Sequence, residues 1–468
     1  MDMTELFTED EQTGFHGTVY EEFASPETAP EPTFPTDKIF VGWSIGDSEM
    51  LREVLDRKMQ NPALDANTAR RQAYIEFSEK VGDKREPVFI DRGDAENADV
   101  MFVPGKRGAG KSFLMRSMTN RSSKGGATNI LIDPKHEFYT NNQYHGIQDD
   151  LVNLRDGESK QNIDTKVLMP YPVYKARNYA DLQEKGYGEH MEVFKFGFDD
   201  LTPDDITFLI KNLGFSENDL DTLANEVQEK LHDDPGAITT FEDIIDLARE
   251  IDEDDGFSWN KFVGRLEQDL KPYQRWGLFG DEEQYDIDLK QVMNEYNSIA
   301  LTLDGGDELP SNLPLMELYI AILIRKNRSL AKRGEIDPPF NYAIDEAHEV
   351  VPAGVDISDH TAKQQIRETI KKDRSLGFRV SLVTQSTGDI DVENFINQTD
   401  HFFMPYNLEP RARRRMLEYA GVFSKNDDRR EKWDYVVRNC PKFTWLYVDS
   451  STQEWYLLEI ASPLAYHD

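Results

Sequence analysis

Short apolar runs alternate with amphipathic segments along the middle of the chain. Runs rich in Val, Ile, Leu and Phe that are bounded by polar or turn-forming residues predict strands. They lie at residues 99–103, 129–133, 193–196, 298–303, 341–344, 379–384 and 401–404. Helical spacing dominates between them, and this alternation is typical of an α/β fold with a mainly parallel sheet. We therefore predict an α/β core that begins near residue 96.

The pattern changes between residues 199 and 291, where apolar positions recur at helical spacing on acidic, polar segments. These positions are Phe208, Leu209, Leu213, Leu223, Val227, Leu231, Ile244, Ile245, Leu247 and Phe262. Because strands are predicted on both sides, we expect residues 199–291 to form a helical subdomain inserted into the core. The core is then divided into residues 96–198 and 292–410.

The two flanks of the core differ from it and from each other. Residues 1–36 are acidic, rich in proline and poor in aliphatic side chains, which indicates a disordered tail. Residues 37–95 form a preamble with a predicted strand at 38–43 and a helical stretch at 48–81. The last segment is 411–468. It contains a basic helix and the two strands of a hairpin candidate, at 411–420, 443–448 and 454–460.

Charge and composition restrict the class of protein. The 53 Lys and Arg against 88 Asp and Glu give a formal charge of −35, which by itself argues against nucleic acid as a partner, because phosphate binding needs Lys and Arg at the contact surface. Such an excess keeps a protein soluble where salt screens self-repulsion, so we interpret it as a sign of a high-salt source. The single cysteine, Cys440, cannot form an intramolecular disulfide, which indicates a reducing compartment. Neither a signal peptide nor a membrane span is predicted.

The strongest candidate for chemistry is a glycine-rich segment between a predicted strand and a predicted helix. It has the GxxxxGKS pattern of a phosphate-binding loop (P-loop), made of Gly105, Lys106, Arg107, Gly108, Ala109, Gly110, Lys111 and Ser112 and followed by Phe113. Glycines let backbone N–H groups wrap phosphates, and the helix N-terminus directs its dipole at them. Lys111 is expected to reach the β- and γ-phosphates of ATP, and Ser112 to bind Mg²⁺.

An acidic pair follows the apolar run at 341–344. Asp345 is expected to hold the Mg²⁺ shell. Glu346 is placed to polarise an attacking water, which favours ATP hydrolysis over phosphorylation of a small molecule. We interpret His348, two residues later, as a packing or polar-network residue instead of a ligand.

Two further polar residues are candidates for the same reaction. Gln385 follows the run at 379–384, where an amide can sense the γ-phosphate. Arg374 precedes that run, and an arginine at a domain edge can stabilise transition-state charge in the site of an adjacent subunit. Surface salt bridges are the alternative role for Arg374 and its neighbours Lys371 and Lys372.

Over residues 95–410 these motifs and their order resemble the HerA/FtsK superfamily of P-loop ATPases, and most of all its HerA branch. The segments that carry the resemblance are 105–112, 131–138, 300–304, 343–352 and 383–385. The resemblance implies a RecA-like core that uses ATP and Mg²⁺, and a homo-oligomeric ring, expected to be a hexamer, that translocates double-stranded DNA. It also implies that Asp133 and Glu137 are acids near the catalytic pocket, although His136 stands where the family has glycine.

The N-terminal β-barrel of the family is not evident in residues 37–95. This favours a relative encoded by a haloarchaeal virus, a plasmid or an archaeon, acting in genome packaging, conjugation or DNA processing. Capsid or membrane proteins are further candidate partners. The expected location is the host cytoplasm or the virion.

DNA contact in so acidic a chain requires local clusters of cations. Three clusters stand out: Arg411 with Arg413, Arg414 and Arg415; Arg429 with Arg430 and Lys432; and Lys371 with Lys372. The pattern does not indicate which of them faces DNA, and neutralisation of acidic neighbours is the alternative for each.

Other protein classes fit parts of the pattern. The Asp-Glu-Ala-His string occurs in RNA helicases, but these carry it much closer to the P-loop than Asp345 lies to Lys111 here. A virion-associated or assembly NTPase that does not translocate DNA is a stronger alternative. An ATPase of membrane fusion or secretion, with a protein substrate, is a third.

Overall fold

The computed structural model describes most of the chain between residues 38 and 465. The described residues are 38–44, 48–62, 64, 69, 72–73, 76, 86–92, 98–135, 138, 141, 158, 161–177, 190–211, 213, 217–234, 236–255, 257–280, 282–309, 314–355, 361–391, 394–421, 434, 437–438, 444–452 and 454–465. The predicted tail, residues 1–36, lies outside them, as do Glu137 and the cluster of Arg429, Arg430 and Lys432.

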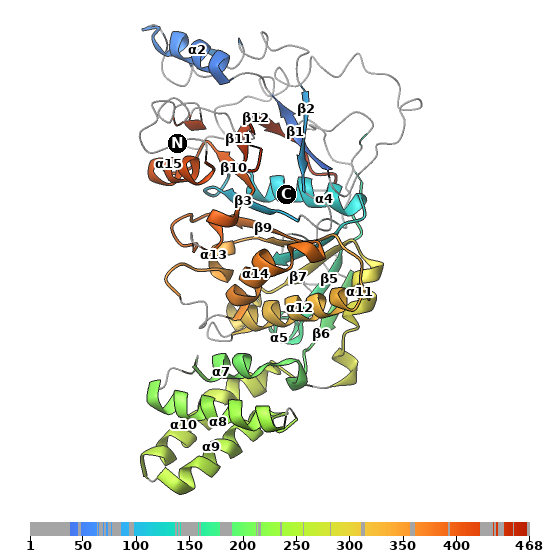
Figure 1. Ribbon diagram of the computed structural model, residues 1–468, viewed down its shortest axis with the longest axis vertical. Coiled ribbons are helices and arrows are strands. Elements are labelled where there is room, and N and C mark those ends of the chain that lie inside the picture. Colours follow the sequence, from blue (N-terminus) through green and yellow to red (C-terminus); the bar gives the residue numbers. More distant parts are fainter. Residues whose placement is uncertain are drawn as a thin grey trace.

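One twelve-stranded sheet runs through the molecule (Figure 1). In the order β10-β3-β9-β8-β4-β7-β5-β6, all neighbouring strands are parallel. The bounds are β3 Val100–Pro104, β4 Thr128–Asp133, β5 Lys166–Pro170, β6 Met191–Phe194, β7 Ser298–Thr302, β8 Phe340–Ile344, β9 Phe378–Thr384 and β10 His401–Pro405. The central strands are buried along their whole length, as expected when both faces of a parallel sheet are covered. The predicted α/β fold is confirmed.

Side chains that alternate along each strand divide the core between the two faces of the sheet. In β3, Met101 and Val103 belong to a buried cluster with side chains of α4, whereas Val100 and Phe102 belong to a larger cluster with α12 and α14. The helices beside the sheet are α4 Lys111–Lys124, α5 Tyr171–Ala176, α11 Leu289–Glu295, α12 Leu315–Lys332, α13 Ala347–Val350 and α14 Thr361–Lys372. The P-loop strand is therefore held from both sides.

Antiparallel strands extend the sheet beyond β10, in the order β11, β12, β1 and β2. Their bounds are β1 Lys38–Ser44, β2 Glu86–Asp91, β11 Thr444–Asp449 and β12 Glu454–Ile460. β11 and β12 form the predicted hairpin. Since β1 and β2 precede the core in sequence and β11 and β12 follow it, segments from both flanks complete one continuous sheet with the core.

The segment between β6 and β7 is helical, as predicted. Its main helices are α7 Pro203–Lys211, α8 Glu217–Asp233, α9 Phe241–Asp255 and α10 Phe257–Trp276. Figure 1 shows them as a group that projects beyond the parallel end of the sheet. All the predicted apolar positions are buried except Phe208, which is half-buried. On α12, Arg325 and Lys326 form ion pairs with Asp205 and Asp200, which join this group to the core.

Two strands, β2 and β5, are absent from the predicted set. Each contains a proline, Pro87 in β2 and Pro170 in β5, and proline lowers the expectation of a strand. The structure tolerates both prolines because β2 is the edge strand of the sheet and Pro170 is the last residue of β5. The helical stretch predicted at 48–81 contains α2, Ser48–Met59, and most of its remainder lies outside the described residues.

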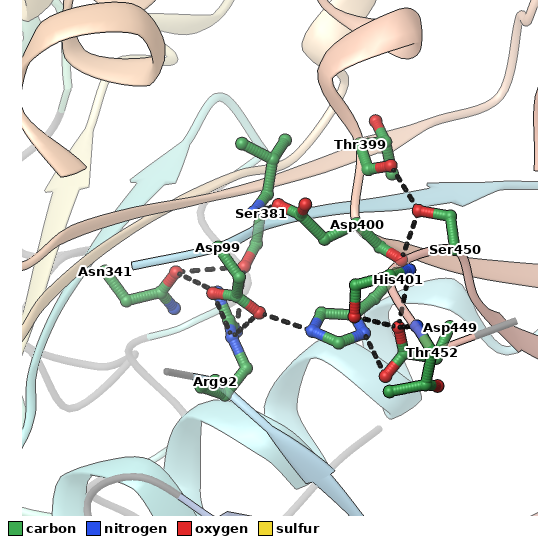
Figure 2. Close-up of polar contacts among 12 residues, drawn as sticks. Arg92, Asp99, Asn341, Ser381, Thr399, Asp400, His401, Asp449, Ser450 and Thr452 are labelled. Atoms are coloured by element: carbon green, nitrogen blue, oxygen red, sulfur yellow. Dashed lines mark hydrogen bonds and ion pairs between the residues drawn. The ribbon is translucent and has the colours of Figure 1, made fainter. Parts of the chain in front are cut away.

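A buried polar network joins the antiparallel extension to the parallel core (Figure 2). Arg92, which follows β2 and is 1% exposed, places its Nε 2.7 Å from Oδ1 of Asp99. Asp99, just before β3, lies 2.9 Å through Oδ2 from Nε2 of His401 on β10. The hydroxyl oxygen of Tyr447 on β11 is 3.0 Å from Nδ1 of the same imidazole. The segment that runs from β2 to β3 thus meets β10 and β11, which lie hundreds of residues later in the sequence, at the amino-terminal ends of β3 and β10.

The network fixes the charge of its members. Burial by itself would raise the pKa of Asp99, but the guanidinium of Arg92 and the imidazole of His401 outweigh it and hold this pKa at about 2. Burial likewise would lower the pKa of His401, but the hydrogen bond and the charge of Asp99 raise it above its ordinary value. The charges of Asp99 and Arg92 therefore stabilise each other, and Asp99 favours the protonated form of His401.

Replacing the central carboxylate should destabilise the fold in a pH-dependent way. Asp99→Asn should lower the free energy of unfolding by roughly 3–5 kcal/mol, because Arg92 is left buried without its counter-charge. Because folding lowers the pKa of Asp99, the contribution of Asp99 to the free energy of unfolding is complete above about pH 4 and is lost as the pH falls toward 2. Because folding raises the pKa of His401, the contribution of His401 is present below about pH 6.5 and is lost at higher pH.

Urea unfolding across pH measures this effect. The difference between wild type and Asp99→Asn should be largest between about pH 4 and 6.5. Glu229→Gln, which removes an exposed carboxylate from α8, is the control and should change stability little at any pH. A difference for Asp99→Asn that is equally small would contradict the role of the network.

Candidate active site

The glycine-rich loop lies between β3 and α4, at the carboxyl end of a central strand. Gly108 and Gly110 have φ angles of 79° and 92°, a left-handed conformation in which glycine is least strained. A Cβ atom at Gly105 would lie 2.9 Å from Cγ of Pro405, so the loop packs closely on the end of β10. α4 begins at Lys111 with no side-chain hydrogen bond at its N-cap, Gly110. α4 thus begins directly after the loop, and the N-terminus of a helix favours the binding of anions.

Lys111 is folded back into the loop. Its side chain is 7% exposed, and its Nζ lies 3.4 Å from the backbone oxygen of Lys106. Ala109 is buried, whereas Ser112 and Phe113, in the first turn of α4, are half-buried. The loop thus holds a largely buried ammonium group at the N-terminus of α4. The remaining cations of the motif, Lys106 and Arg107, are exposed, and Lys106 forms an ion pair with Glu409 at 3.2 Å.

The acidic pair Asp345 and Glu346 directly follows β8. Both residues are 2% exposed. The N–H of Asp345 donates to the carbonyl oxygen of Ile132 on β4, and the N–H of Glu346 donates to Oδ1 of Asp345 at 2.9 Å. Among the described residues, Glu346 is the one non-glycine with positive φ, at 48°. Such a conformation costs energy and is kept where the surroundings determine it, often at functional sites.

Side chains from three neighbouring segments surround the carboxylate of Glu346. Its Oε1 accepts a hydrogen bond from Nε2 of Gln385, which follows β9, and forms an ion pair with Nζ of Lys135. Nδ1 of His348 lies 3.5 Å from Oε2 and 3.2 Å from Oγ1 of Thr384. His348 therefore takes part in a polar network, as interpreted from the sequence.

Lys135 is the residue of this group that is missing from the predicted site. It lies in the turn after β4, the strand that pairs with β8. Asp133, which is 1% exposed, shapes this turn: its carboxylate accepts from the N–H groups of Lys135 at 3.3 Å and Phe138 at 2.9 Å. Lys135 could have been identified because it is a cation that follows the end of β4, and β4 is adjacent to β8, the strand that precedes the acidic pair.

These groups converge because β3, β9, β8 and β4 are adjacent and parallel. The P-loop, Gln385, the acidic pair and Lys135 each follow one of these strands, so all lie at the carboxyl edge of the sheet. A loop suited to bind phosphate and a buried carboxylate therefore lie at the same edge of the sheet.

The same edge offers hard oxygen donors for a metal. No cluster of three or more His, Cys, Asp or Glu in the described parts of the chain could hold an ion without other ligands. The Ser112 hydroxyl and the Asp345 carboxylate are oxygen donors, however, and Mg²⁺ is commonly bound by one or two such groups together with phosphate oxygens and waters. The donor set therefore fits Mg²⁺ that arrives with a nucleotide.

Arg374 lies at the opposite edge of the sheet, before β9. Its guanidinium donates to the carbonyl oxygens of Ile370 at 3.2 Å and Gln398 at 2.9 Å, and it forms an ion pair with Asp400 at 3.2 Å. The side chain is 34% exposed. The structure thus brings Lys111, Glu346 and Gln385 to one edge of the sheet and leaves Arg374 apart from them.

Comparisons with known proteins concern the family and the fold of the chain. Residues 101–330, almost half of the chain, match the family model described as "Helicase HerA, central domain". The matched span contains the P-loop and ends before the acidic pair. No curated protein matches the chain. None of the described helices is long and apolar enough to cross a membrane.

Solved structures resemble the chain to different degrees, and VirB4 shares its overall fold. VirB4 of Thermoanaerobacter pseudethanolicus is 13% identical over 81% of this chain and 94% of that chain, with a TM-score of 0.53. The plasmid coupling protein TrwB is 15% identical over 79% and 86%, with a TM-score of 0.47. The genome packaging NTPase B204 from Sulfolobus turreted icosahedral virus 2 is 12% identical over 80% and 100%, with a TM-score of 0.34. The P-loop and the match to the HerA central domain make the chain similar to P-loop ATPases of the HerA/FtsK type, and its fold is shared with VirB4.

Proposed function

We propose that this ATPase is a motor that translocates double-stranded DNA and works as a ring of identical subunits. The observation that carries the proposal is the convergence of Lys111, Glu346 and Gln385 at one edge of the sheet, which joins a phosphate-binding loop to a candidate base and a candidate sensor. The helicase named in the description of the matching family supports nucleic acid as the substrate. That the present protein comes from a haloarchaeal virus, a plasmid or an archaeon stays a prediction.

The loop residues are proposed to bind the nucleotide. Residues 105–113 would hold the phosphates of ATP, with Lys111 near the β- and γ-phosphates. Ser112 and Asp345 would hold Mg²⁺, which when bound neutralises charge on the phosphate oxygens. The exposed Lys106 and Arg107 add positive charge at the mouth of the loop.

Glu346 is proposed to be the base that takes a proton from the attacking water. Its burial removes competing solvent, and Gln385 and Lys135 hold its carboxylate in place. Because Gln385 contacts Glu346 and follows β9, loss of the γ-phosphate at Gln385 would be transmitted to the loop after that strand. Asp133 would contribute by ordering the turn that carries Lys135.

Arg374 is proposed to act on the nucleotide of an adjacent subunit. Within its own chain it lies at the edge of the sheet opposite the P-loop. Its partial exposure leaves the guanidinium accessible to a neighbouring copy, and guanidinium groups supplied from another subunit can stabilise the charge of phosphoryl transfer. Mutants of these residues test the two parts of the proposal separately.

The nucleotide site is tested by Lys111→Ala and Glu346→Gln. Each should lower ATP turnover by at least about 100-fold, because the first removes a phosphate-binding ammonium and the second removes the base. Glu346→Gln should still bind a fluorescent ATP analogue. Lys124→Ala, at the exposed end of the same helix, is the control and should keep wild-type turnover. Wild-type turnover in either site variant would refute the assignment.

The role of Arg374 is tested by mixing variants. Arg374→Ala should lower turnover by about 10³-fold, the smallest effect usual for an arginine finger. Mixed with Lys111→Ala subunits, it should regain part of the activity, since some interfaces then combine an intact P-loop with an intact Arg374. A mixture of Lys111→Ala with Glu346→Gln should not recover, because each of its P-loop sites carries one defect. Absence of recovery in the first mixture would place Arg374 outside the reaction.

A further inference from the structure

α15, Pro410–Tyr419, carries three exposed arginines on one side. Arg411, Arg414 and Arg415 are spaced three and four residues apart, which places them on one helical face. Arg413 is directed elsewhere: it is 2% exposed, its Nε lies 2.6 Å from Oδ1 of Asp434, and its Nη1 donates to the carbonyl oxygen of Leu408 at 2.8 Å. One arginine therefore anchors the helix, and the other three extend into solvent.

The three exposed arginines form no ion pair with any described residue. Three such cations on one helical face are notable in a chain with 88 acidic residues and 53 basic ones, where other cations do have partners, as Lys230 has Glu250 at 3.2 Å. Like charges at this spacing also destabilise a helix, by about 0.2–0.5 kcal/mol per pair. A concentrated positive face that opposes helix stability indicates a binding surface for a polyanion.

The position of α15 links this face to the nucleotide site. The helix follows β10, whose Pro405 packs on Gly105 of the P-loop, and its N-cap residue Glu409 forms an ion pair with Lys106. The arginine face therefore belongs to the same edge of the sheet as the P-loop. Figure 1 shows α15 beside β10 and β11, on the outside of the molecule.

We propose that Arg411, Arg414 and Arg415 bind the phosphodiester backbone of DNA. Guanidinium groups match phosphate geometry, and contacts to the backbone do not depend on sequence, as a translocating motor requires. The P-loop already supplies donors for the triphosphate of ATP, so a second cationic face suits a longer polyanion. The inference rests on the proposed DNA-motor function and names the surface that this function requires.

The other described cluster fits this role less well. Lys371 and Lys372 end α14 at the edge of the sheet opposite the P-loop, and Nζ of Lys372 lies 3.2 Å from Oε1 of Glu368. One of its two cations is therefore already paired with a carboxylate. The arginine face of α15, by comparison, is unpaired within the described structure.

The test is the salt dependence of DNA binding in the full-length protein. A triple variant, Arg411→Gln with Arg414→Gln and Arg415→Gln, and wild type are titrated with a fluorescent random-sequence DNA duplex at several salt concentrations. Loss of three phosphate contacts should reduce the slope of log affinity against log salt by about 2 to 3, and should weaken binding at ~0.1 M salt by roughly tenfold or more.

Two matched variants separate local contact from net charge. A triple variant with Lys124→Gln, Lys332→Gln and Lys371→Gln has the same net charge, but the lost cations are exposed at the ends of α4, α12 and α14, at the opposite edge of the sheet. It should keep the wild-type slope. A triple Arg→Lys variant of the α15 face keeps the charge and should also keep most of the slope.

The outcomes distinguish this inference from the proposed function. An unchanged slope in the triple Gln variant of α15 would overturn the inference and leave the motor function standing. If the triple Gln variant of α15 lost affinity for ATP but kept its affinity for DNA, these arginines would be assigned to nucleotide binding. That result would also overturn the inference. If wild type bound no duplex at any salt concentration, the inference and the proposed function would both fail.

Discussion

The parallel alignment of β3, β9, β8 and β4 is the constraint on which the active site depends. The chain returns to the amino edge of the sheet before each of these strands, so segments distant in sequence all end at the carboxyl edge. A one-residue shift of a strand would exchange its two faces and would move each side chain from one packed cluster to the other. The left-handed backbone of Glu346 can be maintained only in such a fixed frame.

The charge of the chain gains a specific meaning from this arrangement. A formal charge of −35 would repel DNA if it were spread evenly over the surface. At the carboxyl edge, however, cations gather: Lys106, Arg107 and Lys111 in the loop, Lys135 beside Glu346, and the arginine face of α15. We therefore infer that the excess of carboxylates concerns the solvent-exposed remainder of the protein, and that phosphate is bound where the local balance is positive.

The features predictable from sequence are those encoded within a short segment. The P-loop, the acidic pair and Gln385 each follow an apolar run, so the local pattern was sufficient to place them at strand ends. Lys135 requires knowledge that β4 pairs with β8, and the network of Arg92, Asp99 and His401 requires the pairing of strands hundreds of residues apart. β2 and β5 escaped prediction because their prolines are acceptable only at a sheet edge and a strand end.

The central claim is that ATP hydrolysis at this edge drives movement along DNA. It is tested most directly by ATP turnover of the full-length protein with and without double-stranded DNA, across a salt titration from low to molar concentration. The account predicts that DNA raises turnover in the range of salt where the protein is folded and binds the duplex, and that the stimulation weakens as salt displaces the phosphate contacts. Turnover that is the same with and without DNA at every salt concentration would contradict it, and would favour a nucleotide-dependent assembly protein.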